Sequence, residues 1–344
     1  MSTAYYTLPH IKFLVVILMF VLINFIGCSS KTKIPVIFDT DIGDDIDDAF
    51  ALVMALQSPE LDIRGICVNT GRVELRAKMV AKLLKIAGYT SIPVYLGEIG
   101  PEQGEAAPQM GWVENYEPDI TLKQGAVDFI IASVKDNPNK ISILSYGPLS
   151  TMGAVFSKAP DMVPLVKDLI IMGGAVYIGY NNNPPPVPEY NIKHDTPASQ
   201  IVFLSGVKLT MLGLDVTTMM QPTTDQMLSL GTARTILANP LLVLYLRWAK
   251  FFDFPHDAAP RNVGDLIKAH YGEGKRMKMP TLYDPVAVLT AIDSSDIVFE
   301  KLNLRVDDGG MTVIDNEKGK PVLAGVKVNK EAVLKKIFGM LVNR

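Results

Sequence analysis

The sequence is poor in cysteine, and it lacks an excess of basic residues. Cys28 and Cys67 are the only two cysteines among 344 residues, which excludes a framework of several disulfides. The formal net charge is −3 and the pI is near 5.9. Because the chain has no basic stripe either, we expect no nucleic-acid partner. Internal repeats and low-complexity linkers are absent too, so we expect a single domain after the N-terminal segment.

The first 27 residues differ in character from the rest. Lys12 precedes an apolar stretch over residues 13–26, and Gly27 then precedes Cys28. A positive residue, a short apolar run and a small residue before the cut are typical of a secretory signal peptide rather than a transmembrane helix. Because Gly27-Cys28 resembles a lipobox, we expect removal of residues 1–27, a lipid on Cys28, and export to the periplasmic or cell-surface side of a bacterial membrane. An uncleaved membrane anchor is the alternative.

Beyond residue 31, strand-like and helix-like segments alternate. Apolar runs bounded by turn residues predict strands at 34–38, 63–68, 92–96, 141–144, 168–172 and 208–212. Helical patterns lie between them at 49–56, 73–87, 121–135, 149–156 and 199–204. This alternation predicts a Rossmann-like α/β domain over residues 28–344, with a mostly parallel central sheet flanked by helices. Residues 312–328 predict a final pair of strands before a basic helix.

The most informative segment is the acidic run that follows the first predicted strand. It reads Asp39-Thr-Asp-Ile-Gly-Asp-Asp-Ile-Asp-Asp48, with six aspartates, and an apolar helix follows it. Open α/β sheets bind ligands at the carboxyl ends of their strands. Six neighbouring carboxylates repel one another, which favours a bound hard cation with oxygen ligands. An acidic helix cap without an ion is the simpler alternative.

A strand followed by Asp-x-Asp also resembles the haloacid-dehalogenase phosphatases, in which the first aspartate is a nucleophile. That family has Thr or Val two residues after the second aspartate. This chain has Gly43 there, and it shows no convincing later lysine-plus-acid signature. We therefore disfavour a phosphatase.

Six sequence blocks, in the same order, resemble the nucleoside hydrolases. The acidic run over 39–52 is the first block, and the others are Tyr146–Gly153, Ile170–Gly174, Pro188–Asp195, Leu212–Thr218 and Leu282–Val288. Each block is a weak signal alone, but the ordered set is specific. The resemblance implies an inosine/uridine-preferring, Ca²⁺-dependent enzyme that hydrolyses the bond between ribose and base.

The resemblance also implies roles for individual residues. Asp41 matches the general base and a metal ligand. Asp48, Asp284 and the backbone carbonyl of Tyr146 match the remaining protein ligands of Ca²⁺. Substrate-binding residues of the family, which hold the ribose hydroxyls and the 5′ end, match Asn183, Glu189 and Asn191. The chemistry is consistent, because cleavage builds positive charge on the sugar that nearby carboxylates stabilise.

Departures from the family pattern leave some roles open. The acidic run holds two more residues than the family spacing, so Asp45 or Asp47 takes the inner ribose-binding role, and we favour Asp45. Asn69, upstream of Gly71-Arg72, is the candidate for the substrate-binding asparagine after the second strand. We expect Arg72 itself at the surface.

The leaving-group acid is also open. Tyr283 stands where many members have a catalytic histidine, and a phenol with a pKa near 10 is a weaker acid. His256 follows an aromatic stretch and is the second candidate. A Ca²⁺-dependent nucleoside- or ribose-binding lipoprotein without turnover, or a hydrolase of another N-ribosyl compound, remains an alternative. A homo-oligomer is compatible with the sequence, which does not decide the oligomeric state.

Overall fold

The computed structural model describes residues 32–101, 108–249 and 278–343, together with residue 1. The chain divides into two units, Met1–Lys33 and Ile34–Arg344, and all the helices and strands named here belong to the second. Cys28, His256 and nearly all of the predicted signal segment lie outside the described residues. Within the described ranges, no helix is long and apolar enough to cross a membrane.

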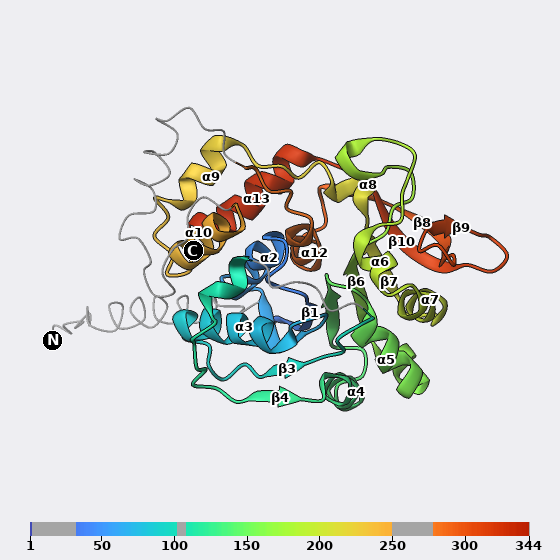
Figure 1. Cartoon of the computed structure of the whole chain (residues 1–344), viewed down its shortest axis with the longest axis horizontal. Helices are drawn as coiled ribbons and strands as arrows, with labels where there is room; N and C mark the ends of the chain where they lie inside the picture. The colour runs from blue at the N-terminus through green and yellow to red at the C-terminus, as the bar shows by residue number, and fades with distance from the viewer. Residues whose placement is uncertain (2–31, 102–107, 250–277, 344) are drawn as a thin grey trace. The chain divides into compact units, whose positions relative to one another are not determined.

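A single sheet of ten strands runs through the second unit (Figure 1). Its order is β4-β3-β2-β1-β5-β6-β7-β10-β8-β9. All neighbours from β4 to β10 in this order pair in parallel, whereas β10–β8 and β8–β9 are antiparallel. The strands are β1 (Ile34–Thr40), β2 (Leu61–Val68), β3 (Val94–Leu96), β4 (Leu122–Gln124), β5 (Ser142–Ser145), β6 (Asp168–Met172), β7 (Leu209–Leu212), β8 (Ile297–Val306), β9 (Thr312–Ile314) and β10 (Lys320–Val328).

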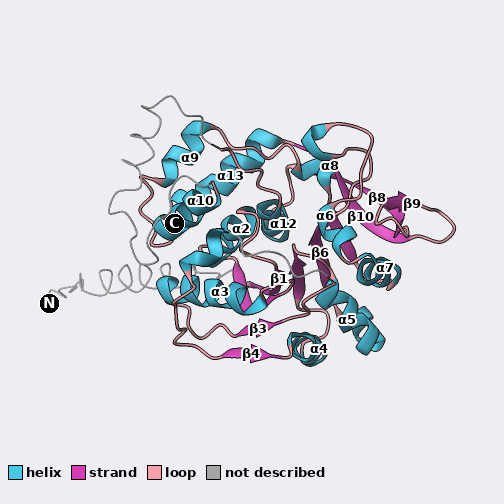
Figure 2. Ribbon diagram, viewed as in Figure 1, coloured by secondary structure: helices cyan, strands magenta, loops and turns pink. Residues whose placement is uncertain are grey.

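Helices connect the strands and cover both faces of the sheet (Figure 2). They are α2 (Asp47–Leu56), α3 (Val73–Ala87), α4 (Ala126–Asp136), α5 (Ser150–Lys158), α6 (Tyr190–His194), α7 (Thr196–Leu204), α8 (Leu214–Thr217), α9 (Thr224–Leu230), α10 (Ala238–Trp248), α12 (Asp284–Ile292) and α13 (Lys330–Val342). Three short 3₁₀ helices are η1 (Pro108–Trp112), η2 (Pro160–Leu165) and η3 (Tyr180–Asn182). The predicted mostly parallel α/β architecture is confirmed.

Two hydrophobic cores lie on opposite faces of the sheet, as the side-chain alternation of β1 shows. Val36 and Phe38 belong to the core that α2, α3, α10, α12 and α13 complete. Ile37, between them, belongs to the core formed with α4, α5 and α7. Successive side chains of a strand point to opposite faces, so a strand covered on both sides reads as an apolar run. Cys67 is buried in the second core.

The structure differs from the sequence-based prediction in three places. The predicted helix over 121–135 begins only at Ala126, because residues 122–124 form β4 beside β3. The helix expected from Ala49 begins at Asp47. Strand β8 was not predicted, since many of its residues are charged or partly exposed and therefore do not form the apolar run by which the other strands were recognised. Short and partly solvated strands carry weak sequence signals, because they form by pairing with a neighbouring strand rather than through an apolar pattern of their own.

The strand order gives β1 a special position in the sheet. Strand β1 lies between β2 and β5, and the chain proceeds outward from β1 in both directions. At such a switch point the connections leave β1 and β5 on opposite sides and open a crevice at their carboxyl ends. The acidic run follows β1 directly and therefore lies at this crevice.

Candidate active site

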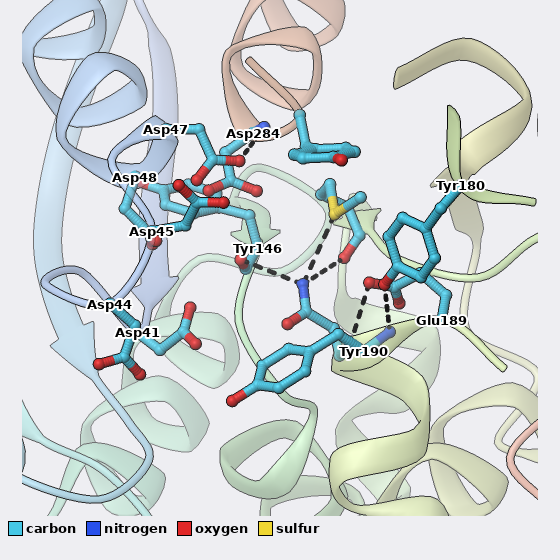
Figure 3. Close-up of a pocket in the computed structure, with 13 residues that line it drawn as sticks. Asp41, Asp44, Asp45, Asp47, Asp48, Tyr146, Tyr180, Glu189, Tyr190 and Asp284 are labelled. Carbon is cyan, nitrogen blue, oxygen red and sulfur yellow. Dashed lines mark hydrogen bonds between the residues drawn. The ribbon is translucent and has the colours of Figure 1, made fainter. Parts of the chain in front are cut away.

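A pocket of about 460 Å³ opens at the carboxyl ends of β1 and β5 (Figure 3). Figure 3 shows Asp47, Asp48 and Asp284 on one side of it, with Tyr180, Glu189 and Tyr190 on the other. The lining combines carboxylates, tyrosines, one amide and one methionine: Asp41, Asp44, Asp45, Asp47, Asp48, Tyr146, Met172, Tyr180, Glu189, Tyr190, Asn191, Tyr283 and Asp284.

Three buried carboxylates form the acidic centre of the pocket. Asp47 and Asp48 are the first two residues of α2, and Asp284 is the first residue of α12, which packs against α2. One carboxylate oxygen of each residue lies within 4.8 Å of the others. The Asp284 backbone N–H donates a hydrogen bond to Asp47 Oδ2 at 3.4 Å. Both helices thus direct their N-termini, the positive ends of their dipoles, at this acidic group.

Among the described residues, no ion pair neutralises the acidic centre. Burial raises the pKa of Asp47, Asp48 and Asp284 well above its usual value, and repulsion from neighbouring carboxylates, Asp41 among them, raises it further. Buried carboxylates supply the oxygen donors that Ca²⁺ prefers, so the residues present fit a hard divalent cation.

Asp41 lies beside this centre, against the turn that follows β5. The Asp41 side chain is nearly buried, and burial raises its pKa to about 7, against the lowering effect of the Arg76 guanidinium. A side chain at Gly147 would come within 2.8 Å of Asp41 Oδ1, so the close approach of the two segments requires glycine there. The carbonyl of Tyr146, one residue earlier, accepts a hydrogen bond from Asn191 Nδ2 at 3.3 Å.

The opposite wall is built by the start of α6. Glu189 caps this helix, and its carboxylate accepts hydrogen bonds from the backbone N–H groups of Gly174 (3.0 Å), Asn191 (3.1 Å) and Ile192 (3.3 Å). Burial raises the pKa of Glu189 to about 7, even though these donors lower it. The N–H donors fix the position of the carboxylate in the pocket.

Besides Tyr146, three tyrosines line the pocket: Tyr180, Tyr190 and Tyr283. Tyr283 directly precedes Asp284, whereas Tyr180 and Tyr190 come from η3 and α6. Tyr180 Oη accepts a hydrogen bond from the Tyr190 backbone N–H at 3.0 Å. The sequence predicted a site role only for Tyr283. Tyr180 and Tyr190 lacked a usable signal, because isolated tyrosines in a loop and at a helix start are common.

The sequence reasoning also missed an ion pair beneath the acidic run. Arg76 of α3 is almost completely buried, and its Nη2 lies 2.6 Å from Oδ2 of Asp44. A signal existed, because Arg76 occupies the apolar stripe of α3 between Val73 and Val80. Arginine on a buried helix face requires a partner for its charge.

Of the twelve residues assigned to the site from the sequence, nine line the pocket: Asp41, Asp45, Asp47, Asp48, Tyr146, Glu189, Asn191, Tyr283 and Asp284. Asn69 does not, although it is buried near Asp41; its amide donates to the carbonyl of Pro148 at 3.2 Å. Asn183 is exposed and pairs with Gly179 through its backbone. His256 lies outside the described residues. Substrate contact by Asn69 or Asn183 stays a prediction.

Comparison with known proteins decides what kind of site this is. A family model described as inosine-uridine preferring nucleoside hydrolase matches residues 36–335, which is most of the chain. The chain belongs to the nucleoside hydrolase family. The resemblance of the six blocks is thereby confirmed, and the phosphatase alternative falls away.

Individual nucleoside hydrolases resemble the chain in sequence and in structure. Uridine nucleosidase 1 of Arabidopsis thaliana is 32% identical over 292 residues, covering 80% of this chain and 79% of the relative. The pyrimidine-specific ribonucleoside hydrolase RihA of Citrobacter koseri is 30% identical, over 66% of this chain and 76% of the relative. A solved plant nucleoside hydrolase superposes with a TM-score of 0.73 at 26% identity, covering 91% of this chain and all of the other.

A purine-preferring ribonucleoside hydrolase from Gardnerella vaginalis gives a similar superposition. Its TM-score is 0.71 at 27% identity, with 89% of this chain and 98% of the other covered. The chain is therefore a ribonucleoside N-glycosyl hydrolase: it cleaves the bond between ribose and base with water. The pocket at the switch point, where the family blocks converge, is its candidate active site.

Proposed function

We propose that this nucleoside hydrolase uses Asp41 as the general base and a Ca²⁺ ion held by Asp48, Asp284, Asp41 and the carbonyl of Tyr146. The observation that carries the proposal is the buried group Asp47, Asp48 and Asp284, whose oxygens lie within 4.8 Å of one another beside Asp41. When bound, Ca²⁺ orients a water molecule, lowers its pKa and binds ribose hydroxyls.

The chain's own carboxylates divide the remaining work. In the reaction, the water oxygen bonds to C1′, the bond from C1′ to the base nitrogen breaks, and one water proton passes to the Asp41 carboxylate. Positive charge develops on the ribose ring as the base departs, and the surrounding carboxylates stabilise it electrostatically. Asp47 takes the inner ribose-binding role rather than Asp45. Its burial and its place at the start of α2 support this, whereas Asp45 is exposed at the pocket rim.

The ribose contacts come from the wall opposite the acidic centre. Glu189 and Asn191 accept hydrogen bonds from ribose hydroxyls, since the Asn191 nitrogen already donates to the carbonyls of Tyr146 and Met172. Tyr180 binds the 5′ hydroxyl; the sequence had offered Asn183, Glu189 and Asn191 together for the ribose hydroxyls and the 5′ end. The phenol of Tyr180 supports this role, because its oxygen already accepts from the Tyr190 backbone N–H and its proton remains available to donate.

Tyr283 donates a hydrogen bond to the leaving base. Burial raises the pKa of Tyr283, and the charges of Asp47, Asp45 and Glu189 raise it further, so the phenol keeps its proton at neutral pH. A phenol of this kind stabilises a departing base without fully protonating it; the base leaves with the electron pair of its bond to C1′ and takes its proton from solvent. His256 remains the second candidate for this step.

Release of free ribose is the direct test of the function. The purified protein is incubated with inosine, uridine and further purine and pyrimidine nucleosides in the presence of Ca²⁺, and reducing sugar is measured. We expect ribose release that stops with a chelator and returns with added Ca²⁺. No release from any nucleoside, together with tight nucleoside or ribose binding measured by calorimetry, would favour the non-catalytic binding protein instead.

Asp41→Asn tests the mechanism. The amide keeps the shape of the side chain but accepts no proton, so we expect kcat to fall by about a hundred-fold or more. The protein should stay folded, because a neutral amide relieves the burial of a charge. Near-normal kcat would refute Asp41 as the base.

The chain's location is a separate part of the proposal. Lys12, the apolar stretch 13–26 and Gly27-Cys28 support cleavage after residue 27 and a lipid on Cys28. Labelling with a radioactive fatty acid in a bacterial host should mark the wild type and leave Cys28→Ser unlabelled. Labelling of both proteins, or of neither, would contradict a lipid on Cys28.

A further inference from the structure

Arg76 joins the loops that follow β1 and β2. From the end of the first turn of α3, its Nε donates to the carbonyl of Thr70 at 2.7 Å, after β2. Its Nη1 donates to the carbonyls of Ile42 (3.0 Å) and Asp41, after β1. Its Nη2 pairs with the carboxylate of Asp44 at 2.6 Å. One side chain thus binds four oxygens, an arrangement of the planar guanidinium that lysine cannot reproduce.

The loop between Asp41 and Asp47 is held on its other side by Gln109. The Gln109 amide, fully buried, donates to the carbonyl of Asp45 at 2.8 Å. Within the loop, Gly43 adopts a φ of +120°, a conformation that other residues rarely take. The loop is therefore held on two sides, by Arg76 and by Gln109, and the residues that exceed the family spacing lie inside it.

The Arg76–Asp44 pair is the only ion pair, among those of the described residues, that includes a residue lining the pocket. Arg76 is buried, but the Asp44 side chain is 30% exposed at the pocket rim. Asp41 contributes its backbone carbonyl to Arg76 and keeps its carboxylate for the pocket. Movement of the guanidinium would consequently move the backbone of Asp41.

We infer that Arg76 is a positioning residue that fixes Asp41 for catalysis, and that Asp44 anchors its guanidinium. The longer acidic run thereby acquires a function: Asp44 binds Arg76 while Asp47 and Asp48 serve the acidic centre. This inference rests on the proposed role of Asp41. Catalysis depends on sub-ångström placement of a reacting group, and a shift of about 1 Å costs up to about a hundred-fold in rate.

Two variants test the inference, Asp44→Ala and Arg76→Lys. Asp44→Ala removes the anchor at a partly exposed position, so the fold is retained. Arg76→Lys keeps the positive charge, but an ammonium group cannot reach all four oxygens that the guanidinium binds. For both we expect kcat to fall by about ten-fold or more while KM for the nucleoside, measured at saturating Ca²⁺, changes less than about three-fold, since Asp41 takes the proton of the attacking water and Asp48, Asp284 and the Tyr146 carbonyl still hold the ion. Calorimetric Ca²⁺ titration should still give one site per chain.

The matched control is Asp315→Ala. It breaks the Arg305–Asp315 pair, whose contact of 2.7 Å is close to the 2.6 Å of Arg76–Asp44 but which lies outside the pocket. A general loss of stability would lower the melting temperature of all three variants without the selective fall in kcat. The inference is overturned if Asp44→Ala and Arg76→Lys both keep the wild-type kcat. An inactive wild type would instead contradict the proposed function, so the two failures are distinguishable.

Discussion

The side-chain amide of Asn191 donates hydrogen bonds to the carbonyl of Tyr146 at 3.3 Å and to that of Met172 at 3.1 Å. Tyr146 follows β5 and Met172 ends β6, so one buried amide of α6 connects the ends of two neighbouring strands. This contact orients the carbonyl that we propose as a Ca²⁺ ligand. Partners of this kind hold metal ligands in place and strongly affect metal affinity.

Replacing Asn191 with leucine should therefore weaken Ca²⁺ binding as well as catalysis. We expect about a ten-fold or greater loss of Ca²⁺ affinity, because such orienting partners are worth about 10–100-fold. Unfolding free energy should fall by about 1–3 kcal/mol, since buried carbonyls lose their donor. Calorimetric titration and thermal denaturation measure both effects. Wild-type Ca²⁺ affinity in a folded Asn191→Leu protein would contradict the proposed orientation of Tyr146.

The variants Asp47→Asn and Asp45→Asn test which of the two aspartates binds ribose. Asp47→Asn should lower kcat/KM by about a hundred-fold or more, because a buried carboxylate facing ribose is lost from the acidic centre. Asp45→Asn should have a much smaller effect, since the Asp45 side chain is exposed. Its Oδ1 accepts a hydrogen bond from the backbone N–H of the next residue, Ile46, at 2.7 Å. Steady-state kinetics with one nucleoside decide between them, and a larger loss for Asp45→Asn would reverse the assignment.

Tyr180→Phe removes one hydroxyl from the pocket. With ordinary nucleosides we expect kcat/KM to fall by about three- to ten-fold, the value of one hydrogen bond. With 5′-deoxynucleosides the variant and the wild type should react alike, because the partner hydroxyl is missing. Tyr190→Phe is the control, because Tyr190 also lines the pocket but contacts Tyr180 through its backbone N–H. If Tyr180→Phe lowers kcat/KM equally with ordinary nucleosides and with 5′-deoxynucleosides, the Tyr180 hydroxyl does not bind the 5′ hydroxyl.

The Lys336 cluster predicts a pH dependence of stability away from the pocket. Lys336 Nζ lies 2.6 Å from Asp293 Oδ2 and 2.5 Å from Asp296 Oδ2, which fixes α13 to the end of α12. Hydrogen bonds from Lys336 and Ser295 lower the pKa of Asp293, and both aspartates raise the pKa of Lys336. Because the pKa of Asp293 is lowered in the folded state, its ion pair stabilises the fold at pH values above the ordinary aspartate pKa, and this stabilisation disappears as the pH falls through the lowered pKa. Because the pKa of Lys336 is raised, its ion pairs stabilise the fold at pH values below the ordinary lysine pKa, and this stabilisation is lost as the pH rises through the raised pKa.

Lys336→Met should accordingly lower the melting temperature between about pH 5 and pH 9, by a small amount because the groups are solvated. The difference from the wild type should shrink toward pH 3 and above pH 11. Lys335→Met, at the neighbouring exposed position, serves as the control. A difference that is independent of pH would show that packing rather than charge explains the effect.

Much of the fold and part of the site followed from local sequence. The apolar runs predicted β1, β2, β5, β6 and β7, and α3 has the predicted bounds, since Gly88 adopts the left-handed conformation that ends a helix. The acidic run, Glu189 and Asn191 were recognisable because each lies within a short block of fixed spacing. Strand β4 and strand β8 were missed because neighbouring strands, not their own composition, determine them.

Other features depended on contacts between distant parts of the chain. Asp47 and Asp284 are 237 positions apart, and only the packing of α12 against α2 brings them together, which supports our proposal of Asp47 rather than Asp45 for the ribose contact. Likewise, sequence could place Arg76 on a buried helix face but could not name Asp44 as its partner. The sequence alone determined which segments are strands, helices and acidic, because periodicity and spacing are local properties. Only the tertiary structure decided which of these acids share a buried site, because burial and charge proximity depend on the packing of the whole chain.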